Sequence, residues 1–342
     1  MSANRFRKLR QSTAVLVFAI AVVAVLILTM ESFAAATVSE PGNVRKNYLV
    51  FCLDDTGYNT DAILLVGLNL GNTEATFLQL PRDTYFESGD ENRKLNGLWY
   101  RYYSESGDKT TASRRFAAFI SQHFSVPVDG SILLTTGGVA SVIDAMGGVT
   151  LDIDADMYYS DPAQDLEIRL PAGKHRLSGA DAVKFARYRH AYLTGDLGRL
   201  DAQKMLMAAL FREAENFSAG QYARVATTLW QVTDTDIPLR DILGLGIVYL
   251  TKKSDVALRF LTLPGDATQY NGTHGVWYYS LNRKSAGKVT EKYFGGNAAA
   301  FDINGSFCGD TDPMKKIYYD ESQKIVEYSI DNVWQIKIAT TK

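Results

Sequence analysis

The chain has 342 residues, of which 46% are hydrophobic and 22% are charged, and it contains no repeats or low-complexity tracts. This composition is that of a globular protein long enough for one large domain or two small ones. The net charge is −2, and because residues 1–30 carry four basic and no acidic residues, the remainder has 32 basic and 38 acidic residues, or −6. Such a charge argues against a general nucleic-acid binder, so we expect no nucleic-acid partner.

The N-terminal segment predicts the compartment of the protein. A basic stretch at 5–10 precedes seventeen uncharged residues at 14–30, an order that keeps the N-terminus in the cytoplasm and sends the rest outward. We therefore expect a cytoplasmic basic flank and a transmembrane signal anchor over 1–30 and a linker over 31–46. The apolar run has the minimum length of a spanning helix, and SFAAA at 32–36 offers a cleavage site, so a released form is the alternative.

The next part of the chain alternates between strand and helix patterns. Short apolar runs rich in Val, Ile, Leu and Phe predict strands, and Gly71-Asn72 is a suitable hairpin turn between the second and third. Strands are expected over 47–53, 61–69, 74–80, 130–136, 149–154 and 257–263. Helices are expected over 110–124, over 137–148 where a glycine pair closes the segment, and over 237–250. This alternation predicts an α/β domain with a central sheet.

The stretch 178–203 gathers three arginines around one short loop. Ser178 followed by Asp181 is a capping box, so we expect a helix from there toward Ala186 and a second helix over 198–216. Arg187 and Arg189 then lie at the start of the connecting loop 190–196, and Arg199 lies at its end. Three guanidiniums in this arrangement can clamp phosphate oxygens, because each offers a planar fork of donors and keeps its charge. Ordinary surface salt bridges are the alternative.

Acidic residues follow the first predicted strands. Asp54 and Asp61 flank the loop DDTGYNTD, and Arg82 and Asp83 follow the third strand. Ligands of α/β sheets gather at such strand ends. Two carboxylates across a tight loop can share a hard cation such as Mg²⁺, which accepts one or two carboxylates and keeps room for water and phosphate oxygens. A solvated acidic turn is the alternative.

Several of these motifs occur together in a fixed order. They are FLQLPRDTYF at 77–86, KLN at 94–96, VIDAMGGVTLDID at 142–154, LPAGKHRLSGADAVKFARYR at 170–189 and GDLGR at 195–199. In order and spacing, the region from about 47 to 265 resembles the LytR-CpsA-Psr family of cell-envelope glycopolymer transferases. The resemblance implies a three-layer α/β/α catalytic domain with a central mixed sheet, which we assign to 47–295.

The resemblance also implies a set of site residues. Asp54 and Asp61 match the metal-site aspartates, with Mg²⁺ or Mn²⁺ as the cofactor. The residues matched to catalytic positions are Arg82, Asp83, Arg187, Arg189, Asp196 and Arg199, and those matched to substrate binding are Lys94, Asn96 and Gln203. Asp83 or Asp196 could act as the general base, or each could orient an arginine.

The implied reaction is phosphoryl transfer from a polyprenyl-diphosphate-linked glycopolymer to a hydroxyl of peptidoglycan, by a protein anchored in a bacterial cell membrane with its C-terminal domain outside. Such reactions depend on positioning and charge neutralisation. A diphosphatase acting on the lipid carrier and a non-catalytic envelope scaffold are the alternatives. The chain has Asn59-Thr60 and Ala202 where the family tends to have an arginine, and Trp99 where a tyrosine is usual. Fewer arginines are therefore available to bind phosphate than is usual in the family, which keeps the scaffold alternative open.

Three further expectations concern the rest of the chain. The apolar runs 205–210 and 242–250 are either the lining of a lipid groove or plain core. Residues 296–342 are expected to form a small β-rich C-terminal extension, with strands at KIYYD, KIVEYSI and VWQIKIA. An exported domain permits a disulfide between Cys52 and Cys308, whereas a buried thiol at Cys52 is the alternative. The four histidines lack zinc-site spacing, and no GxSxG elbow is present.

Overall fold

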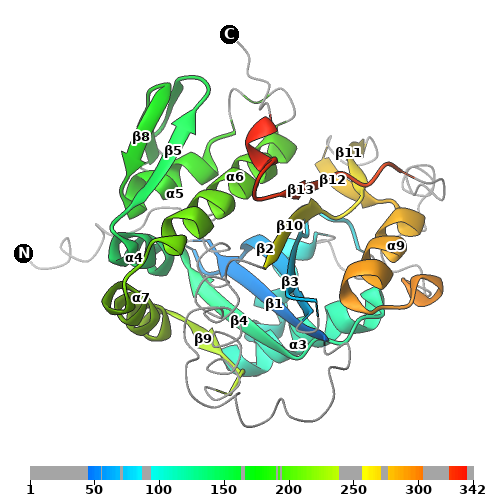
Figure 1. The fold of residues 1–342 in the computed structure, drawn as a ribbon. Coiled ribbons are helices and arrows are strands. Elements are labelled where there is room, and N and C mark those ends of the chain that lie inside the picture. Colours follow the sequence, from blue (N-terminus) through cyan, green and yellow to red (C-terminus); the bar gives the residue numbers. More distant parts are fainter. Residues whose placement is uncertain are drawn as a thin grey trace, which may run out of the picture.

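A computed structural model describes residues 45–54, 56–69, 72–86, 94–162, 166–189, 192, 195–238, 256–270, 276–302 and 323–336 (Figure 1). Within these ranges no helix has both the length and the apolar character needed to cross a membrane. The anchor predicted over 1–30, the linker up to residue 44 and the predicted helix 237–250 beyond Pro238 lie outside the described residues, whereas the last two linker residues begin β1.

A seven-stranded mixed sheet forms the centre of the molecule, as predicted. Its strand order is β13-β10-β3-β2-β1-β4-β9. The pairs β1–β4 and β3–β10 are parallel, and the other neighbouring pairs are antiparallel. The strands are β1 (Arg45–Leu53), β2 (Thr60–Asn69), β3 (Glu74–Gln79), β4 (Gly130–Thr135), β9 (Asp234–Thr235), β10 (Ala257–Thr262) and β13 (Glu327–Ser329). The predicted hairpin is present, with Asn69 of β2 opposite Glu74 of β3.

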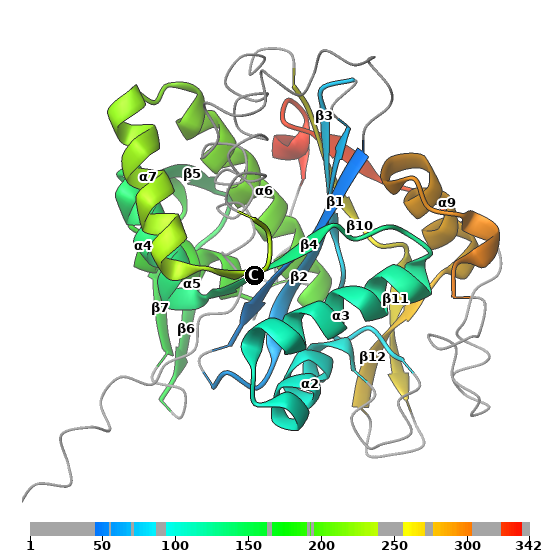
Figure 2. The ribbon, with the colours of Figure 1, turned by 90° about the horizontal axis from the view of Figure 1, so that it is seen from below.

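Alternation along β1 builds a hydrophobic core on each face of this sheet. Val50 and Cys52 belong to the first core cluster, whereas Leu49 and Phe51 belong to the second, on the opposite face. Successive side chains of a strand point to opposite faces, so both faces must be covered. Figure 2 shows this arrangement, with α4–α7 to one side of the sheet and α2, α3 and α9 to the other. The predicted α/β/α layering is therefore confirmed.

Helices cover both faces of the central sheet. The first face carries α4 (Thr136–Met146), α5 (Gly179–Arg187), α6 (Asp196–Glu215) and α7 (Ala219–Val232). The second carries α2 (Leu98–Ser106), α3 (Lys109–Phe124) and α9 (Arg283–Phe294). The 3-10 helices are η1 (Leu95–Gly97), η2 (Ala298–Ala300) and η3 (Val333–Gln335). Most of α6 is buried, and residues 205–210 are at most 5% exposed in the first core cluster, so this run is packed core.

Three two-stranded sheets lie outside the central one. The pairs are β5 (Val149–Ile153) with β8 (Gly173–Leu177), β6 (Met157–Asp161) with β7 (Leu166–Leu170), and β11 (Gly265–Tyr270) with β12 (Val276–Leu281). The strand predicted over 149–154 is thus present as β5, but its partner is β8, outside the central sheet.

The described part of the predicted C-terminal extension joins the main body. Strand β13, within KIVEYSI, pairs antiparallel with β10 and forms the edge of the central sheet. The strand predicted at VWQIKIA is wrong for its first three residues, which form η3. The chain turns directly after β13, where the side-chain oxygen of Asn332 accepts a hydrogen bond from the Ser329 N–H at 2.6 Å, and Val333 becomes fully buried. KIYYD and Cys308 lie outside the described residues, and Cys52 is buried on β1.

Candidate functional site

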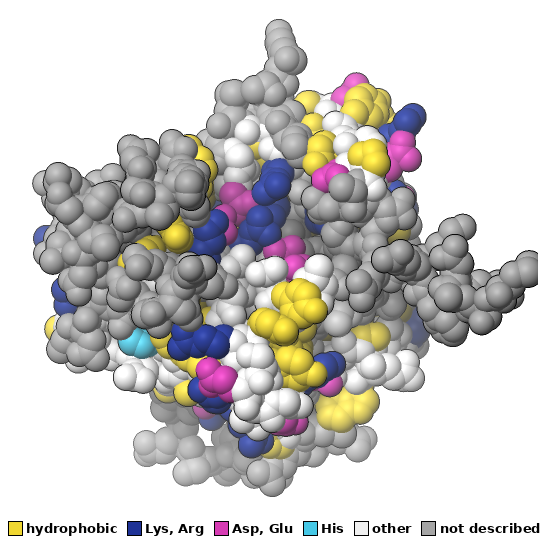
Figure 3. Space-filling model, turned by 180° about the vertical axis from the view of Figure 1, so that it is seen from behind, with side chains coloured by type: hydrophobic (Ala, Val, Ile, Leu, Met, Phe, Trp, Pro, Cys, Tyr) yellow, Lys and Arg dark blue, Asp and Glu magenta, His cyan; other side chains and the backbone are white. Residues whose placement is uncertain are grey.

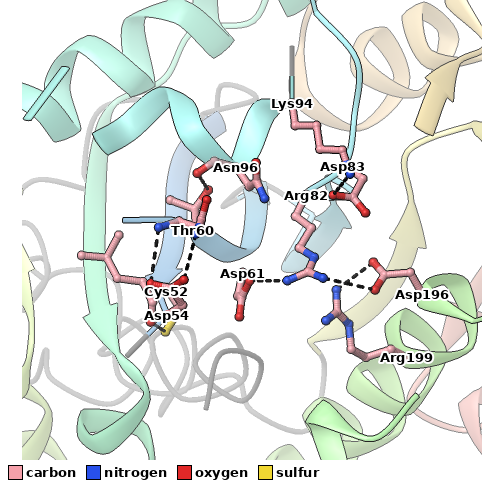
Figure 4. A network of polar contacts seen from close by, with 12 residues as sticks. Cys52, Asp54, Thr60, Asp61, Arg82, Asp83, Lys94, Asn96, Asp196 and Arg199 are labelled. Carbon is pink, nitrogen blue, oxygen red and sulfur yellow. Dashed lines mark hydrogen bonds and ion pairs between the residues drawn. The ribbon is translucent and has the colours of Figure 1, made fainter. Parts of the chain in front are cut away.

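The site is built at the sheet edge where β1 and β3 end and β2 begins. Leu53 pairs with Thr60 and Cys52 pairs with Ala62, which leaves Asp61 as the extra residue of a β-bulge. Bulges redirect a side chain and are frequent beside active sites. Figure 4 shows the Asp61 carboxylate turned toward Arg82. The register of β1 with β2 therefore sets the direction of the Asp61 side chain.

Asp54 is the first residue of the loop that joins β1 to β2, and its carboxylate accepts hydrogen bonds from the rest of that loop. Its Oδ1 accepts hydrogen bonds from the Thr56 hydroxyl at 2.6 Å and from the backbone N–H of Tyr58 at 3.2 Å. Its Oδ2 accepts one from the side-chain amide of Asn59 at 3.0 Å. Asn59, which stands near the position of a usual family arginine, is therefore used to hold Asp54 in place.

Arg82 occupies the centre of the cluster (Figure 4). One terminal nitrogen forms an ion pair with Asp61, and the other lies 3.8 Å from Asp196 Oδ1. Asp196 Oδ2 in turn accepts a hydrogen bond from Arg199 at 2.7 Å. Asp61 and Asp196, which are far apart in the sequence, thus both contact the Arg82 guanidinium.

The segment after Arg82 is fixed by its neighbours. The backbone N–H of Asn96 donates to the Arg82 carbonyl at 3.0 Å, and Tyr279 N on β12 donates to the Asp83 carbonyl at 2.8 Å. Lys94 forms an ion pair with Asp83 at 3.0 Å. The Asn96 carbonyl accepts a hydrogen bond from the buried hydroxyl of Thr60 at 3.2 Å. Lys94 and Asn96, which the resemblance matches to substrate binding, thus lie beside Arg82 and Asp83.

Helix α6 begins with the motif GDLGR. Gly195 has φ +54°, and a Cβ on Gly198 would lie 2.7 Å from Tyr192 Cβ, so the two glycines permit the turn and the close packing of the first helical turn. The helix was expected from 198, but it starts at Asp196, which therefore lies in its first turn. Arg199 follows one turn later and is only 4% exposed.

Arg187 and Arg189 lie on the other side of this connection. The capping box predicted at Ser178 is partly present: its hydroxyl accepts a hydrogen bond from Asp181 N–H at 3.1 Å, and α5 ends at Arg187. Arg187 is half-buried and Arg189 is exposed. Arg189 is near enough to act electrostatically on Asp196 and Arg199. Arg189 and Arg199 therefore lie near each other, and Arg187 lies at the end of α5.

Sequence reasoning missed Gln79. Its amide donates to Gln203 Oε1 at 3.2 Å and to the Leu200 carbonyl at 2.9 Å, so it joins β3 to α6. Its own oxygen accepts a hydrogen bond from Thr262 at 3.1 Å. The available signal was a glutamine in an otherwise apolar strand, since a buried polar residue needs partners.

Burial and charge act against each other in this cluster. Burial alone would lower the pKa of Arg82, but Asp61, Asp196 and Asp83 outweigh it and raise that pKa. Burial alone would raise the pKa of Asp196, but Arg199, Arg82 and Arg189 lower it. Burial lowers the pKa of Arg199 despite Asp196. The two arginines remain charged at neutral pH because arginine is effectively always protonated, and Asp196 is ionised because its pKa is lowered.

Several buried polar atoms of the cluster have no hydrogen-bond partner in the described part of the chain. They are Arg82 Nε, Arg199 Nε, Gln203 Nε2, Asp196 Oδ1 and the hydroxyl of Tyr192. Buried polar groups normally have partners, so these atoms mark a site built for a ligand. Three of them are N–H donors, which suit an oxygen-rich anion. On the face of the molecule drawn in Figure 3, Lys and Arg side chains lie beside Asp and Glu side chains in a hollow.

The two predicted metal ligands fit a divalent ion in kind. Both are carboxylates at the same end of the β1–β2 pair, and hard cations prefer oxygen ligands. The described residues contain no group of three or more His, Cys, Asp or Glu side chains that could hold a metal. Asp61 also pairs with Arg82. An ion bound by Asp54 and Asp61 would therefore need substrate oxygens or water to complete its coordination.

Comparisons with known proteins give the family and the fold of this chain. Residues 37–294 match the sequence model of the LytR_cpsA_psr family. The polyisoprenyl-teichoic acid–peptidoglycan teichoic acid transferase TagU of Bacillus cereus is 26% identical over 261 residues, which cover 74% of this chain and 78% of TagU. The crystal structure of protein gbs0355 from Streptococcus agalactiae has a TM-score of 0.61 at 20% identity, covering 78% of this chain and 90% of that one. TagT bound to LI-WTA has a TM-score of 0.57 at 21% identity, covering 75% and 93%. These two structures support the fold.

Proposed function

The chain belongs to the LytR_cpsA_psr family, and we propose that it is a transferase that joins an anionic or capsular glycopolymer to peptidoglycan. The donor is a polyprenyl-diphosphate-linked glycopolymer, and the acceptor is a peptidoglycan hydroxyl. The name of the TagU relative, a transferase of teichoic acid to peptidoglycan, supports this substrate class. The observation that carries the proposal is the cluster of Arg82, Asp196 and Arg199, in which the buried Nε atoms of both arginines have no hydrogen-bond partner among the described residues.

In this proposal the acceptor hydroxyl attacks the sugar-proximal phosphorus, and polyprenyl phosphate leaves. Arg82 Nε, Arg199 Nε and Gln203 Nε2 donate to diphosphate oxygens, and Arg187 and Arg189 add charge from the end of α5. Preformed donors of this kind need no reorganisation when charge develops during the reaction. Asp61 and Asp196 hold Arg82 in position from two sides.

The two candidates for the general base differ in their surroundings. Asp196 has a lowered pKa and faces two arginines, so it is a weak base and suits an orienting role. Asp83 lies beside Arg82 in sequence and pairs with Lys94, which leaves it as the better candidate to accept the proton of the attacking hydroxyl. A base must reach the proton that it removes, and Asp83 lies on the same strand exit as Arg82.

A divalent ion, Mg²⁺ or Mn²⁺, held by Asp54 and Asp61 would neutralise part of the diphosphate charge. The basic flank and apolar run of residues 1–30 support a single-pass anchor in a bacterial cell membrane, with the domain outside. The polyprenyl chain would then reach the site from the membrane in which its carrier resides.

The direct test is reconstitution of the full-length protein with labelled polyprenyl-diphosphate-linked glycan and peptidoglycan. We expect label in the wall polymer and release of polyprenyl monophosphate. Release of the glycan phosphate to water alone would instead identify a diphosphatase. Binding without either product, under conditions where the related TagU is active, would identify a scaffold.

A further inference from the structure

A cavity of about 230 Å³ lies between α6 and the C-terminal segment 323–328. On one wall it is lined by Leu200, Asp201 and Lys204 of α6, and on the opposite wall by Val326 and Tyr328. Its floor includes Thr262, the last residue of β10. Residues 323–328 follow the part of the chain that matches the family, which ends at 294. This wall therefore lies outside the part of the chain that the family model matches.

The cavity adjoins the cluster of Arg82, Asp196 and Arg199, which we call the arginine cluster. The first turns of α6 carry Asp196, Arg199 and Gln203 for the cluster, and the interleaved Leu200, Asp201 and Lys204 line the cavity. Gln79 bridges the two, because it donates to Gln203 and to the Leu200 carbonyl and accepts from Thr262. A ligand in the cavity would thus lie one helix turn away from the proposed transfer site.

The polar groups of the cavity form a donor, an acceptor and a ring face. Lys204 is only 3% exposed, and its ammonium donates to Asp201 at 2.6 Å and lies 5.7 Å above the Tyr328 ring. The Asp201 side chain is 34% exposed, so its carboxylate keeps capacity to accept further hydrogen bonds. Burial and then Asp201 raise the pKa of the Tyr328 hydroxyl, which agrees with their proximity.

This combination favours a polyhydroxyl ring. Lys204 and Asp201 neutralise each other inside the cavity, and Lys324, the remaining charged residue of the lining, is exposed to solvent. Adjacent hydroxyls can donate to a carboxylate and accept from an ammonium, and the apolar face of a pyranose can pack on an aromatic ring. The nearby Leu197 and Leu263 side chains add apolar surface to the lining.

The outer wall is held in place by several contacts. The side-chain amide of Gln323 donates to the Gly265 carbonyl at 3.0 Å, and its backbone N–H donates to the Ser285 hydroxyl at 2.7 Å. Glu327 pairs with Arg259, which also contacts Glu74 at 2.8 Å. The wall is thus a fixed part of the sheet edge.

We propose that this cavity is a subsite for one neutral sugar ring of a glycan whose chain passes the arginine cluster. The binding claim stands on the cavity alone, and the role of that sugar in transfer rests on the proposed function. The ring belongs either to the peptidoglycan acceptor or to the glycan carried by the donor.

The binding test uses the full-length protein and two probes. These are the soluble disaccharide of N-acetylglucosamine and N-acetylmuramic acid, and polyprenyl-diphosphate-linked N-acetylglucosamine. Val326→Trp should block the cavity, because Val326 is 50% exposed and the larger side chain can turn inward with little cost to folding. Tyr328→Leu should remove the stacking face and weaken binding about fivefold. Ala223→Trp, which adds the same side chain at an exposed position of α7, is the control.

Saturation-transfer NMR measures disaccharide binding, and steady-state kinetics separate the two sources. A higher KM for peptidoglycan in the two variants, with the donor KM and kcat unchanged, identifies the acceptor sugar. A higher KM for the donor identifies the donor sugar. Wild-type binding of both probes by Val326→Trp and Tyr328→Leu would overturn the inference. Absence of transfer in the wild-type protein, with probe binding lost in the variants, would refute the proposed function and leave the sugar subsite standing.

Discussion

At the scale of single residues, Arg82 explains why the acidic residues of the site are so closely grouped. Its side chain is only 18% exposed, and a buried cation must be paired to remain charged without a large cost. Asp61 and Asp196 supply this pairing through the two terminal nitrogens, while Nε has no partner among the described residues. The guanidinium is thus fixed in orientation with one donor kept for a ligand.

Replacement of Arg82 by Lys tests this role of the planar fork. Lysine keeps the charge but cannot contact Asp61, Asp196 and a diphosphate oxygen at fixed angles. We expect kcat/KM for transfer to fall at least about tenfold, which corresponds to about 1.4 kcal/mol of transition-state stabilisation. Arg101→Lys, at a position whose side chain is 40% exposed, is the matched control and should leave transfer unchanged. Equal turnover of the Arg82→Lys variant and the wild-type protein would contradict the assignment.

Asp196 gives a prediction for the pH dependence of stability. Burial opposes its charge, but Arg199, Arg82 and Arg189 bring its pKa in the folded protein below the ordinary 3.8. The ionised carboxylate therefore stabilises the folded state above the ordinary pKa, and this contribution is lost as pH falls through the folded pKa. The difference in free energy of unfolding between wild type and Asp196→Asn should be constant between about pH 5 and 7 and should shrink below about pH 4.

Urea unfolding across this pH range measures the difference. Asp331→Asn, on the exposed turn after β13, is the control and should show no such change. A difference that grows toward low pH would show that Asp196 is not stabilised as a carboxylate.

At the scale of elements, local sequence signals predicted the segments with strong patterns but missed α2, α7 and α9, and they predicted only one strand pairing, the β2–β3 hairpin. Ser178 indicated the start of α5, and the apolar runs indicated β1, β2 and β3, because capping and periodicity are local. The bulge at Asp61 depends on the register of β1 with β2, which no local pattern specifies. The bridge from Gln79 to Gln203 joins residues that are 124 positions apart.

The C-terminal segment shows the same limit. Its strand pattern was visible, but its position beside β10 comes from antiparallel pairing with a distant strand, which an ion pair between Arg259 and Glu327, 68 positions apart, accompanies. VWQ has strand-like composition, yet it forms η3 because Val333 and Trp334 pack into the first core cluster beside α6. Arg212 of α6 lies 4.4 Å above the Trp334 ring and donates to the Ile330 carbonyl at 3.1 Å. Tertiary contacts here override a weak local preference.

Val333→Ala tests whether this segment stabilises α6. Val333 is fully buried in the first core cluster, and its truncation should lower the free energy of unfolding by about 2 kcal/mol. Val326→Ala removes the same atoms from a side chain that is 50% exposed, so its effect should stay within about 0.5 kcal/mol. Urea unfolding gives both values, and hydrogen exchange should become faster in α6 for Val333→Ala only. Equal destabilisation by the two variants would show that η3 is not part of the core.

At the scale of the whole molecule, the site gathers four arginines and their acidic partners in a chain whose net charge is −2. Arg82 comes from the end of β3, and Arg187, Arg189 and Arg199 come from the two helices at the other side of the site and the connection between them. Global attraction of an anionic substrate is therefore weak, and binding depends on this cluster and on any cation that accompanies the substrate.

A chelator experiment tests that cation. If Asp54 and Asp61 hold Mg²⁺ together with the donor diphosphate, transfer should disappear in excess chelator and return with Mg²⁺ or Mn²⁺. Asp61→Asn should stay inactive after metal is added, because it loses both a metal ligand and the partner of Arg82. Asp129→Asn, which removes an ion pair with Lys46 near the start of β1, is the control and should respond to metal like the wild type. Full transfer in excess chelator would exclude the metal assignment.

The last prediction concerns the lipid that a diphosphate carrier brings to the domain. Residues 205–210, one candidate lining for a lipid groove, are packed core. We therefore expect the lipid tail to be bound by another apolar surface, separate from the arginines that bind the head group. Charge holds the head, whereas burial holds the tail at about 0.8 kcal/mol per CH₂. The dissociation constants of geranyl, farnesyl and geranylgeranyl diphosphate should therefore fall by at least about tenfold per added isoprene unit until the apolar site is full. Arg82→Ala should weaken all three ligands by the same factor, since contributions of distant groups add. Calorimetric titration gives these constants, and affinities that do not depend on chain length would exclude a tail-binding site.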